Sequence, residues 1–232
     1  SGEHPDLSRK DNDFFFFQRL GFEEASDFVT DLCCSRLPKA YDYSPVDDIQ
    51  ILCPSRKGVL GIVELNKKLQ MNLNPPVRDK SEIKSLVYTF RAGDKVMQTK
   101  NNYDIEWKRD KEAGAGIFNG DIGKILMINK HDNEVIIDFD GRICTYTSDL
   151  LEQLELAYAI TVHKSQGSEF EAVIIPLMDI GSRLCYRNLL YTAVTRAKKL
   201  LIIVGNSRTI MAMVDNNKKS GRFTNLRFML GE

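Results

Sequence analysis

The sequence predicts an α/β fold that is interrupted once by a small β-rich segment. Strand-like apolar runs alternate with amphipathic stretches in residues 1–88 and again in residues 152–232, as a layered parallel sheet requires. Between them, short strand-like runs follow one another closely and are separated by turn-forming residues, which is typical of a small antiparallel barrel. We therefore expect one discontinuous α/β domain, residues 1–88 plus 152–232, with a β-domain inserted at residues 89–151.

The first α/β stretch contains two predicted strand–helix pairs. Residues 13–18 form a short aromatic strand, and from Phe22 apolar residues recur at intervals of three and four, which predicts an amphipathic helix. Residues 49–53 have the unbroken apolar character of a buried strand. A second helix is expected to carry Val59, Ile62, Val63 and Leu69 and to end at the Asn-Pro-Pro sequence of residues 74–76.

Four strands are predicted in the inserted segment. Residues 131–133 are predicted to form a turn, and Asp140-Gly141 is the two-residue signal of a β-hairpin. The Asp-Phe-Asp sequence of residues 138–140 runs into this hairpin turn, so we interpret its two acids as part of a turn and not as a nuclease site. The predicted strands are residues 95–99, 122–129, 134–139 and 142–147.

The α/β pattern returns after residue 151. Residues 172–176 and 200–204 are predicted buried strands, and a last helix is predicted from Ser207. Residues 187–199 are predicted to form one helix with its apolar residues on one face and Arg196 on the other. We therefore expect Arg196 to project from a rigid helix, with an ordinary solvated helix face as the alternative.

Composition indicates a soluble, cytoplasmic protein. The chain of 232 residues is 43% apolar and 28% charged, and it contains no apolar run near the roughly 20 residues that a membrane-spanning helix needs. Its five cysteines form no C-x-x-C pair, so we expect them to be reduced core residues. Residues 1–50 carry a net charge of −6 and the remainder +6, which permits a basic groove. The chain starts with Ser1, and we expect it to be a piece of a longer polypeptide.

The sequence ITVHKSQGSEF, at residues 160–170, gathers polar groups where a core segment should continue. A lone histidine is more often a satisfied structural residue than a ligand, so a structural role for each member stays open at this point. Metal binding is not expected, because the three histidines show no ligand spacing.

Two stretches together resemble motifs V and VI of superfamily 1 DNA helicases, namely LAYAITVHKSQGSEFEAVIIP and NLLYTAVTRAKKLLIIVG. The stretches DFFFFQR, DIQILCPSRKGVLGIVELNKKLQ, RAGDKVMQTKNNYD and IFNGDIGKI are similar to the RecD-like branch, the family of the exodeoxyribonuclease V alpha subunit. The resemblance covers nearly the whole chain. It implies a RecA-like second motor domain, called 2A, with an inserted SH3-like barrel, called 2B.

The resemblance implies an ATP-dependent 5′-to-3′ DNA helicase in which ATP lies between the first and second motor domains. By motif position, Arg196 would be the arginine finger that reaches the γ-phosphate. Gly167 would let the backbone approach the nucleotide. Glu169 would accept hydrogen bonds from the ribose hydroxyls, and Gln166 would sense the nucleotide at the same edge.

The resemblance also implies a track for single-stranded DNA across both motor domains. Thr161 and His163 would face the DNA backbone, with Lys164 as a further candidate. Ser55 and Arg56 follow a predicted strand and are candidates for phosphate contacts; a serine helix cap beside a surface arginine is the alternative.

In the inserted segment, loops are expected to present aromatic and amide groups. These groups suit stacking and backbone tracking on single strands; for Phe118 and Trp107, filling the ends of the barrel is an equal alternative. The residues are Asn101, Asn102, Tyr103, Trp107, Phe118 and Asn119.

A phosphate-binding P-loop is missing from the sequence. The nearest stretch, FNGDIGKI at residues 118–125, lacks both the first glycine and the final hydroxyl residue of that motif. The resemblance therefore implies that the first motor domain, upstream of this chain, binds the ATP phosphates and Mg²⁺, and that the chain alone is inactive as an ATPase. Implied partners are that domain, single-stranded DNA and RecBCD-like subunits, and no membrane. The competing function is a non-catalytic nucleic-acid-binding module.

Overall fold

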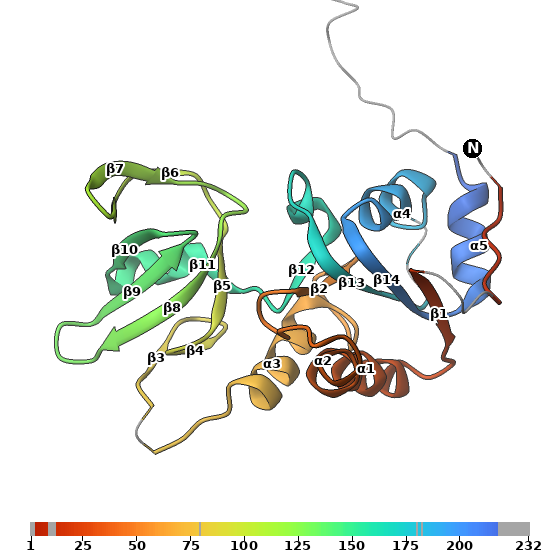
Figure 1. Cartoon of the computed structure of the whole chain (residues 1–232), viewed down its shortest axis with the longest axis horizontal. Helices are drawn as coiled ribbons and strands as arrows, with labels where there is room; N and C mark the ends of the chain where they lie inside the picture. Colours follow the sequence, from red (N-terminus) through yellow and green to blue (C-terminus); the bar gives the residue numbers. More distant parts are fainter. Residues whose placement is uncertain (1–2, 9–12, 79, 180, 182, 218–232) are drawn as a thin grey trace, which may run out of the picture.

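The computed structural model describes residues 3–8, 13–78, 80–179, 181 and 183–217. It contains a five-stranded parallel sheet and a seven-stranded antiparallel sheet that lie side by side, with a small two-stranded sheet next to the antiparallel one (Figure 1). The predicted α/β fold class is confirmed. Among the described residues, no helix is long and apolar enough to cross a membrane.

The parallel sheet has the strand order β1-β14-β13-β2-β12, and every neighbouring pair runs parallel. Residues of its central strands are buried on both faces, which explains why these strands read as unbroken apolar runs. The strands are β1 (Phe14–Gln18), β2 (Ile49–Cys53), β12 (Ala159–Thr161), β13 (Phe170–Leu177) and β14 (Ala197–Gly205).

Helices cover both faces of the parallel sheet (Figure 1). Ile51 packs into the cluster formed with α1 and α3, and its neighbour Leu52 packs into the cluster formed with α4 and α5, because successive side chains of a strand point to opposite faces. The helices are α1 (Phe22–Asp31), continued by a π-helical turn (Leu32–Arg36) into α2 (Leu37–Tyr41), α3 (Ile62–Leu73), α4 (Arg187–Val194) and α5 (Ser207–Asp215).

The prediction of one helix over residues 187–199 is wrong at its C-terminal end. Helix α4 ends at Val194, and β14 already begins at Ala197. Thr195 closes the helix, because its hydroxyl donates to the carbonyl oxygens of Tyr191 (3.0 Å) and Thr192 (3.1 Å). Arg196 therefore lies in a two-residue connection between helix and strand, not on a helix face.

The antiparallel sheet has the order β11-β5-β8-β9-β10-β6-β7. No pairing joins the edge strands β11 and β7 in the described part of the chain, so the closed barrel stays a prediction, as does the domain division at residues 89–151. The strands are β5 (Lys95–Gln98), β6 (Asn102–Arg109), β7 (Glu112–Ile117), β8 (Ile122–Asn129), β9 (Glu134–Phe139), β10 (Arg142–Tyr146) and β11 (Leu154–Leu156).

The four predicted strands of this sheet are confirmed within one residue, but β6 and β7 were not predicted. Asn102, Tyr103 and Trp107 therefore lie on strand β6 and not in a loop. The predicted turn at Asp140-Gly141 is confirmed: both residues have positive φ, 54° and 83°.

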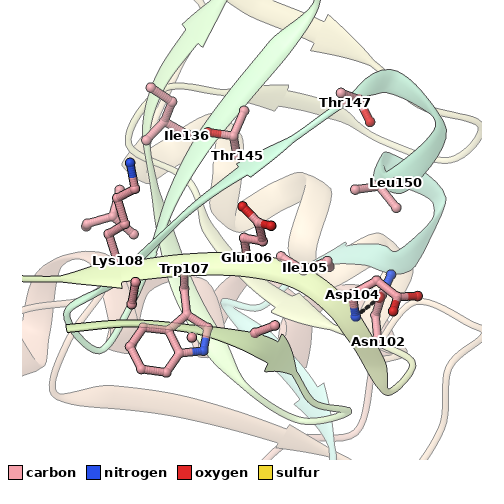
Figure 2. Close-up of a pocket in the computed structure, with 14 residues that line it drawn as sticks. Asn102, Asp104, Ile105, Glu106, Trp107, Lys108, Ile136, Thr145, Thr147 and Leu150 are labelled. Carbon is pink, nitrogen blue, oxygen red and sulfur yellow. Dashed lines mark hydrogen bonds between the residues drawn. The ribbon is translucent and has the colours of Figure 1, made fainter.

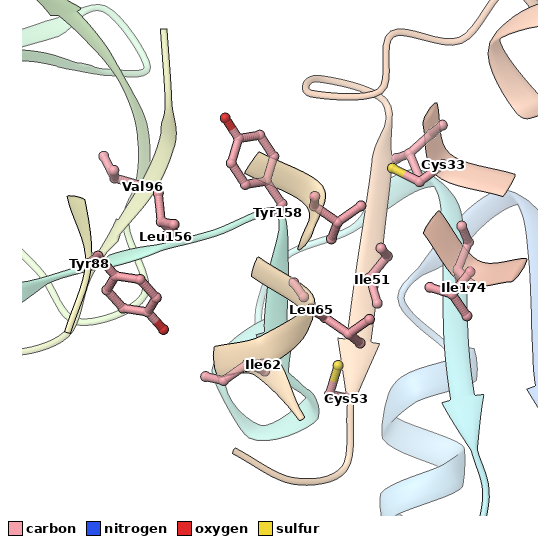
Figure 3. Packing of buried hydrophobic residues seen from close by; sticks show 14 of the residues in the cluster. Cys33, Ile51, Cys53, Ile62, Leu65, Tyr88, Val96, Leu156, Tyr158 and Ile174 are labelled. Carbon is pink, nitrogen blue, oxygen red and sulfur yellow. The ribbon is translucent and has the colours of Figure 1, made fainter. Parts of the chain in front are cut away.

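A buried polar network and an apolar cluster join the two sheets. The Asp94 carboxylate accepts hydrogen bonds from Asn74 Nδ2 (2.6 Å), Gln70 Nε2 (2.6 Å) and Tyr158 OH (2.9 Å), which links the end of α3 to the segments before β5 and β12. Figure 3 shows apolar side chains from both sheets in the same cluster. The two-stranded sheet, β3 (Glu82–Lys84) and β4 (Thr89–Arg91), leads into this junction.

Candidate functional site

The polar stretch at residues 162–169 runs from one edge of the parallel sheet to the other. It leaves the carboxyl end of β12 and reaches the amino end of β13, and both strands are parallel to β2. Only a short 3₁₀ turn (Val162–Ser165) lies within it. Except for Asn101 and Lys164, the predicted site residues therefore separate into two groups, one at each edge of the sheet.

The first group lies at the amino edge, where β13 and β14 begin. The backbone N–H of Phe170 donates to the carbonyl oxygen of Arg196 (2.8 Å), and Arg196 Nη1 donates to the carbonyl oxygen of Ser168 (3.0 Å). The structure therefore brings Arg196 and the bend that carries Glu169 to the same edge.

The Arg196 guanidinium is half-buried and held by backbone and side-chain acceptors. Its Nε donates to the carbonyl oxygen of Thr192 (3.2 Å) and its Nη2 to Thr195 Oγ1 (3.2 Å), in addition to the Ser168 contact. A guanidinium carries five N–H donors in a rigid plane. Contacts with described residues use three of them, so the group retains donors for an anion in a fixed orientation.

The rest of the bend is open. Gly167 has φ +89°, and a Cβ atom built there would meet no atom within 4 Å. Gln166 and Glu169 are exposed, and Glu169 forms no hydrogen bond or ion pair with the described residues. Exposed amide and carboxylate groups beside a held guanidinium fit the polar groups of a nucleotide, so these residues suit ATP chemically.

The second group lies at the carboxyl edge, where β2 and β12 end. Thr161 is half-buried, and His163 is exposed with its Nε2 3.2 Å from the hydroxyl of Tyr186. Tyr186 is the N-cap residue of α4 and was not predicted as a site residue. It is 23 positions from His163, so no local sequence pattern links them.

Ser55 and Arg56 also lie at this edge, but they are engaged within the protein. The Arg56 guanidinium donates to both oxygens of Glu155 (3.1 and 2.5 Å), and this hydrogen bonding raises the pKa of Arg56. The alternative that Ser55 caps a helix is wrong, because the N-cap of α3 is Gly61 and the Ser55 hydroxyl donates to the carbonyl oxygen of Lys57 (3.0 Å).

Lys164 points to the antiparallel sheet. Its Nζ donates to the carbonyl oxygen of Thr99 (3.2 Å) and to Asn119 Oδ1. Burial lowers the pKa of Lys164, and nearby Glu155 opposes this shift. Any contact of Lys164 with DNA would therefore compete with two existing hydrogen bonds.

Asn101 belongs to a structured corner of the antiparallel sheet. Its Oδ1 accepts a hydrogen bond from the backbone N–H of Asn119 (2.9 Å). Next to this corner, the rings of Tyr103 and Phe118 meet edge-to-face at 5.5 Å and are 67% and 40% exposed. These two aromatic rings are accessible for stacking.

Trp107 has a different environment. Its ring packs on Gly114 of the neighbouring strand, where a Cβ atom would come within 2.5 Å of the ring. Trp107, Asn102 and Glu106 are among the residues that line a cavity of about 930 Å³ next to β6. Figure 2 shows these side chains. In the described residues no group of three or more His, Cys, Asp or Glu side chains could hold a metal ion.

Two family models match the chain. Residues 65–139 match the SH3 domain of ATP-dependent RecD-like DNA helicases, and residues 156–204 match the UvrD-like helicase C-terminal domain, which includes both the polar stretch and Arg196. The chain belongs to the RecD-like helicases. The RecD-like model covers part of the antiparallel sheet, and the UvrD-like model covers part of the parallel sheet.

Similar proteins of known name agree with this assignment. The chain is 37% identical to the ATP-dependent RecD2 DNA helicase of Deinococcus radiodurans over 68% of its length and 20% of that protein. It is 30% identical to the RecBCD enzyme subunit RecD of Mycolicibacterium smegmatis over 78% of its length and 29% of that protein. The chain therefore spans less than a third of the length of these two RecD-like relatives.

A solved structure shares the fold. The Pif1 helicase from Bacteroides, crystallised with ADP-AlF3 and single-stranded DNA, aligns with 92% of this RecD-like chain and 51% of its own, with a TM-score of 0.51 and 20% identity. At this identity the likeness describes the fold alone.

Proposed function

We propose that the chain is the C-terminal motor part of an ATP-dependent 5′-to-3′ DNA helicase of the RecD type. In this proposal residues 1–88 and 152–232 form motor domain 2A, and residues 89–151 form the inserted domain 2B. One observation carries the proposal: Arg196 and the bend with Glu169 lie at the same amino edge of the sheet. The Arg196 guanidinium is held there by three hydrogen bonds and keeps N–H groups that no described residue uses.

At the amino edge, the proposed ligand is ATP held between this domain and a first motor domain. Bound ATP supplies a γ-phosphoryl group whose transfer to water releases the free energy for movement. Arg196 would stabilise the charge on that group, because its planar fork is fixed by three acceptors before the ligand arrives. Glu169 and Gln166 would contact the ribose side, and Gly167 would allow close approach. Mg²⁺ ligands are assigned to the first motor domain.

At the carboxyl edge, the proposed ligand is single-stranded DNA. Thr161 and His163 would contact its backbone, and Tyr186 would orient the His163 ring. Ser55 and Arg56 would extend this track, and Asn101 would continue it into the inserted domain. In this arrangement Arg56 must leave Glu155, or share it, in order to bind phosphate.

The segment of residues 162–169 would couple the two ligands. It connects the proposed DNA edge to the proposed nucleotide edge in only eight residues, and the 3₁₀ turn Val162–Ser165 takes up half of them. A shift of the bend on hydrolysis would therefore move Thr161 and His163 relative to DNA.

The test uses the longer protein that contains this chain. Arg196→Ala should lower DNA-stimulated ATP turnover by about 10³-fold or more, as for other arginine fingers, and leave binding of a labelled oligonucleotide within about twofold. Arg196→Lys, which keeps the charge but not the fork, should also be strongly impaired. Equal loss of DNA binding would assign Arg196 a structural role. Unchanged turnover would favour the non-catalytic nucleic-acid-binding module.

The chain alone provides a second test. It should hydrolyse no ATP, with or without oligonucleotide, because the phosphate-binding loop is assigned to the first motor domain. DNA-stimulated turnover by the isolated chain would contradict this division of roles. Co-purification of the longer protein with RecB- and RecC-like subunits would distinguish a subunit of a RecBCD-like complex from a stand-alone enzyme.

A further inference from the structure

Lys95 is a buried cation at the junction of the two sheets. It is the first residue of β5, and only 6% of its surface is exposed. Its side chain lines a polar cavity of about 790 Å³ at the amino edge of the parallel sheet. Among the described residues, its Nζ forms no hydrogen bond and no ion pair, and it lies 5.9 Å from the centroid of the Phe170 ring.

The surroundings do not neutralise this ammonium. Burial lowers the pKa of Lys95 to about 8, and the negative charges of Asp47 and Asp48 only partly oppose the shift. Both aspartates are engaged with Ser44: its hydroxyl donates to Asp47 Oδ2 (2.7 Å), and its backbone N–H donates to Asp48 Oδ2 (2.7 Å). A buried charge without a partner destabilises the protein. An anion bound at Lys95 Nζ would therefore gain electrostatic and hydrogen-bonding interactions that the described residues do not provide.

The remaining charges of the cavity lie nearer its rim or have partners. Asp121 forms an ion pair with Arg142 (2.9 Å), and Asp138 Oδ1 accepts a hydrogen bond from the backbone N–H of Gly141 (2.6 Å). The other charged lining residues are exposed, namely Asp47, Lys124, Asp140, Glu169 and Lys198. Lys95 is therefore the buried charge without a counter-ion in this cavity.

We propose that this cavity binds a small oxyanion, inorganic phosphate, with the Lys95 ammonium as its principal ligand. The choice of phosphate rests on the proposed function. Ser168, Glu169 and Phe170 line the cavity, and the carbonyl oxygen of Ser168 also holds the Arg196 guanidinium. Phosphate released beside Arg196 would thus meet the Lys95 ammonium on the far side of the same bend. Binding there would slow the release of phosphate or determine the path by which it leaves.

The experiment is a titration of the chain with sodium phosphate, observed through the side-chain resonances of ¹³C-labelled lysine. Without phosphate, the Lys95 resonance should titrate with a midpoint near 8. Saturating phosphate should raise that midpoint by about one unit, which corresponds to a tenfold preference for the charged amine. Lys95→Met should weaken phosphate binding at pH 7 at least tenfold, and Lys124→Met, at the exposed rim, less than twofold.

Several results would overturn the assignment. A Lys95 midpoint that phosphate does not move would exclude the site, and this measurement needs no variant, so misfolding of Lys95→Met cannot obscure it. Saturable binding that persists in a folded Lys95→Met chain would place phosphate elsewhere. An equal effect of sodium acetate at matched ionic strength would overturn the choice of phosphate over a carboxylate.

The site and the proposed function can fail separately. Phosphate binding to the chain requires no ATP hydrolysis, so it would survive a finding that the longer protein is not a helicase. If the longer protein is a helicase, Lys95→Met should reduce inhibition of its ATPase by added phosphate at least fivefold. Unchanged inhibition with intact binding to the chain would show that the site does not act in turnover.

Discussion

Arg196 Nη1 donates a hydrogen bond to the carbonyl oxygen of Ser168 at 3.0 Å, across 28 positions of the chain. The contact joins the connection between α4 and β14 to the bend that precedes β13. Since the backbone N–H of Phe170 also donates to the carbonyl oxygen of Arg196 (2.8 Å), the two segments are held together from both sides. The guanidinium and the bend therefore form one rigid unit.

Thr195 should act as a positioning residue for this unit. Its hydroxyl accepts a hydrogen bond from Arg196 Nη2 (3.2 Å) and donates to the last turn of α4. Thr195→Val keeps the shape but removes the acceptor, so ATP turnover of the longer protein should fall about three- to tenfold, as expected for one hydrogen bond. Steady-state kinetics should place the loss in kcat, with DNA affinity unchanged.

The matched control is Thr192→Val. The Thr192 hydroxyl donates to the carbonyl oxygen of Asn188 (2.8 Å) in the same helix, and the Arg196 contact uses only the Thr192 backbone oxygen. Turnover should therefore stay within about twofold of wild type, since no hydrogen bond to Arg196 is lost. A similar decrease in both variants would show that the effect comes from helix stability and not from the guanidinium.

Lys164 should stabilise the contact between the polar stretch and the antiparallel sheet. Lys164→Met removes the hydrogen bonds to Thr99 and Asn119, so the free energy of unfolding should fall by about 1 kcal/mol in the absence of DNA. Urea denaturation of Lys164→Met, Asn119→Ala and the double variant should give a coupling energy of about 0.5 kcal/mol or more. Additive effects would mean that the two side chains do not interact in solution.

The sequence predicts correctly those elements whose apolar pattern results directly from the burial of their side chains. Ile49–Cys53 is buried at every position, so its apolar run identified the strand. Strand β6 is mostly exposed, and β7 is rich in Gly and Ala, which are uncommon in strands, so neither showed a strand pattern.

The errors at the site have a different cause, since they depend on contacts between distant segments. Apolar periodicity continues through Ala197, but pairing of Ala197 with Phe170 starts a strand there, and this tertiary pairing overrides helix propensity. Lys164 finds its acceptors 65 and 45 positions away. In the sequence, Lys95 has the pattern of an ordinary strand residue. It is buried because the two sheets pack together, which the sequence pattern does not show.

The buried Lys95 ammonium should lower stability at neutral pH. The pKa of Lys95 is lowered to about 8 in the folded chain, so between pH 8 and about 10.4, the ordinary value, the unfolded chain binds more protons. Stability of the wild type should therefore rise with pH through this window. Below pH 8 the amine is charged in both states, and the full penalty applies.

Lys95→Met should accordingly be more stable than wild type by about 2 kcal/mol at pH 7, with the advantage decreasing between pH 8 and 10.4. Urea denaturation of both chains across this range measures the difference, and groups that titrate equally in both cancel. Lys124→Met, an exposed lysine of the same cavity, should show no such trend. A destabilised Lys95→Met at pH 7 would show that the ammonium has a stabilising partner.

Asp94 should connect the stabilities of the two sheets. Its carboxylate accepts hydrogen bonds from side chains of α3 and from Tyr158, and burial raises its pKa because the charged form loses solvation. Asp94→Ala would leave these buried donors without an acceptor, at a cost of about 3 kcal/mol.

The single tryptophan, Trp107, lies in the antiparallel sheet and reports on that sheet alone. In wild type, tryptophan fluorescence and far-ultraviolet circular dichroism should give one shared urea midpoint, because both sheets pack into one apolar cluster. In Asp94→Ala the two midpoints should separate, and a common midpoint at lower urea would instead show that the apolar cluster alone keeps the sheets cooperative.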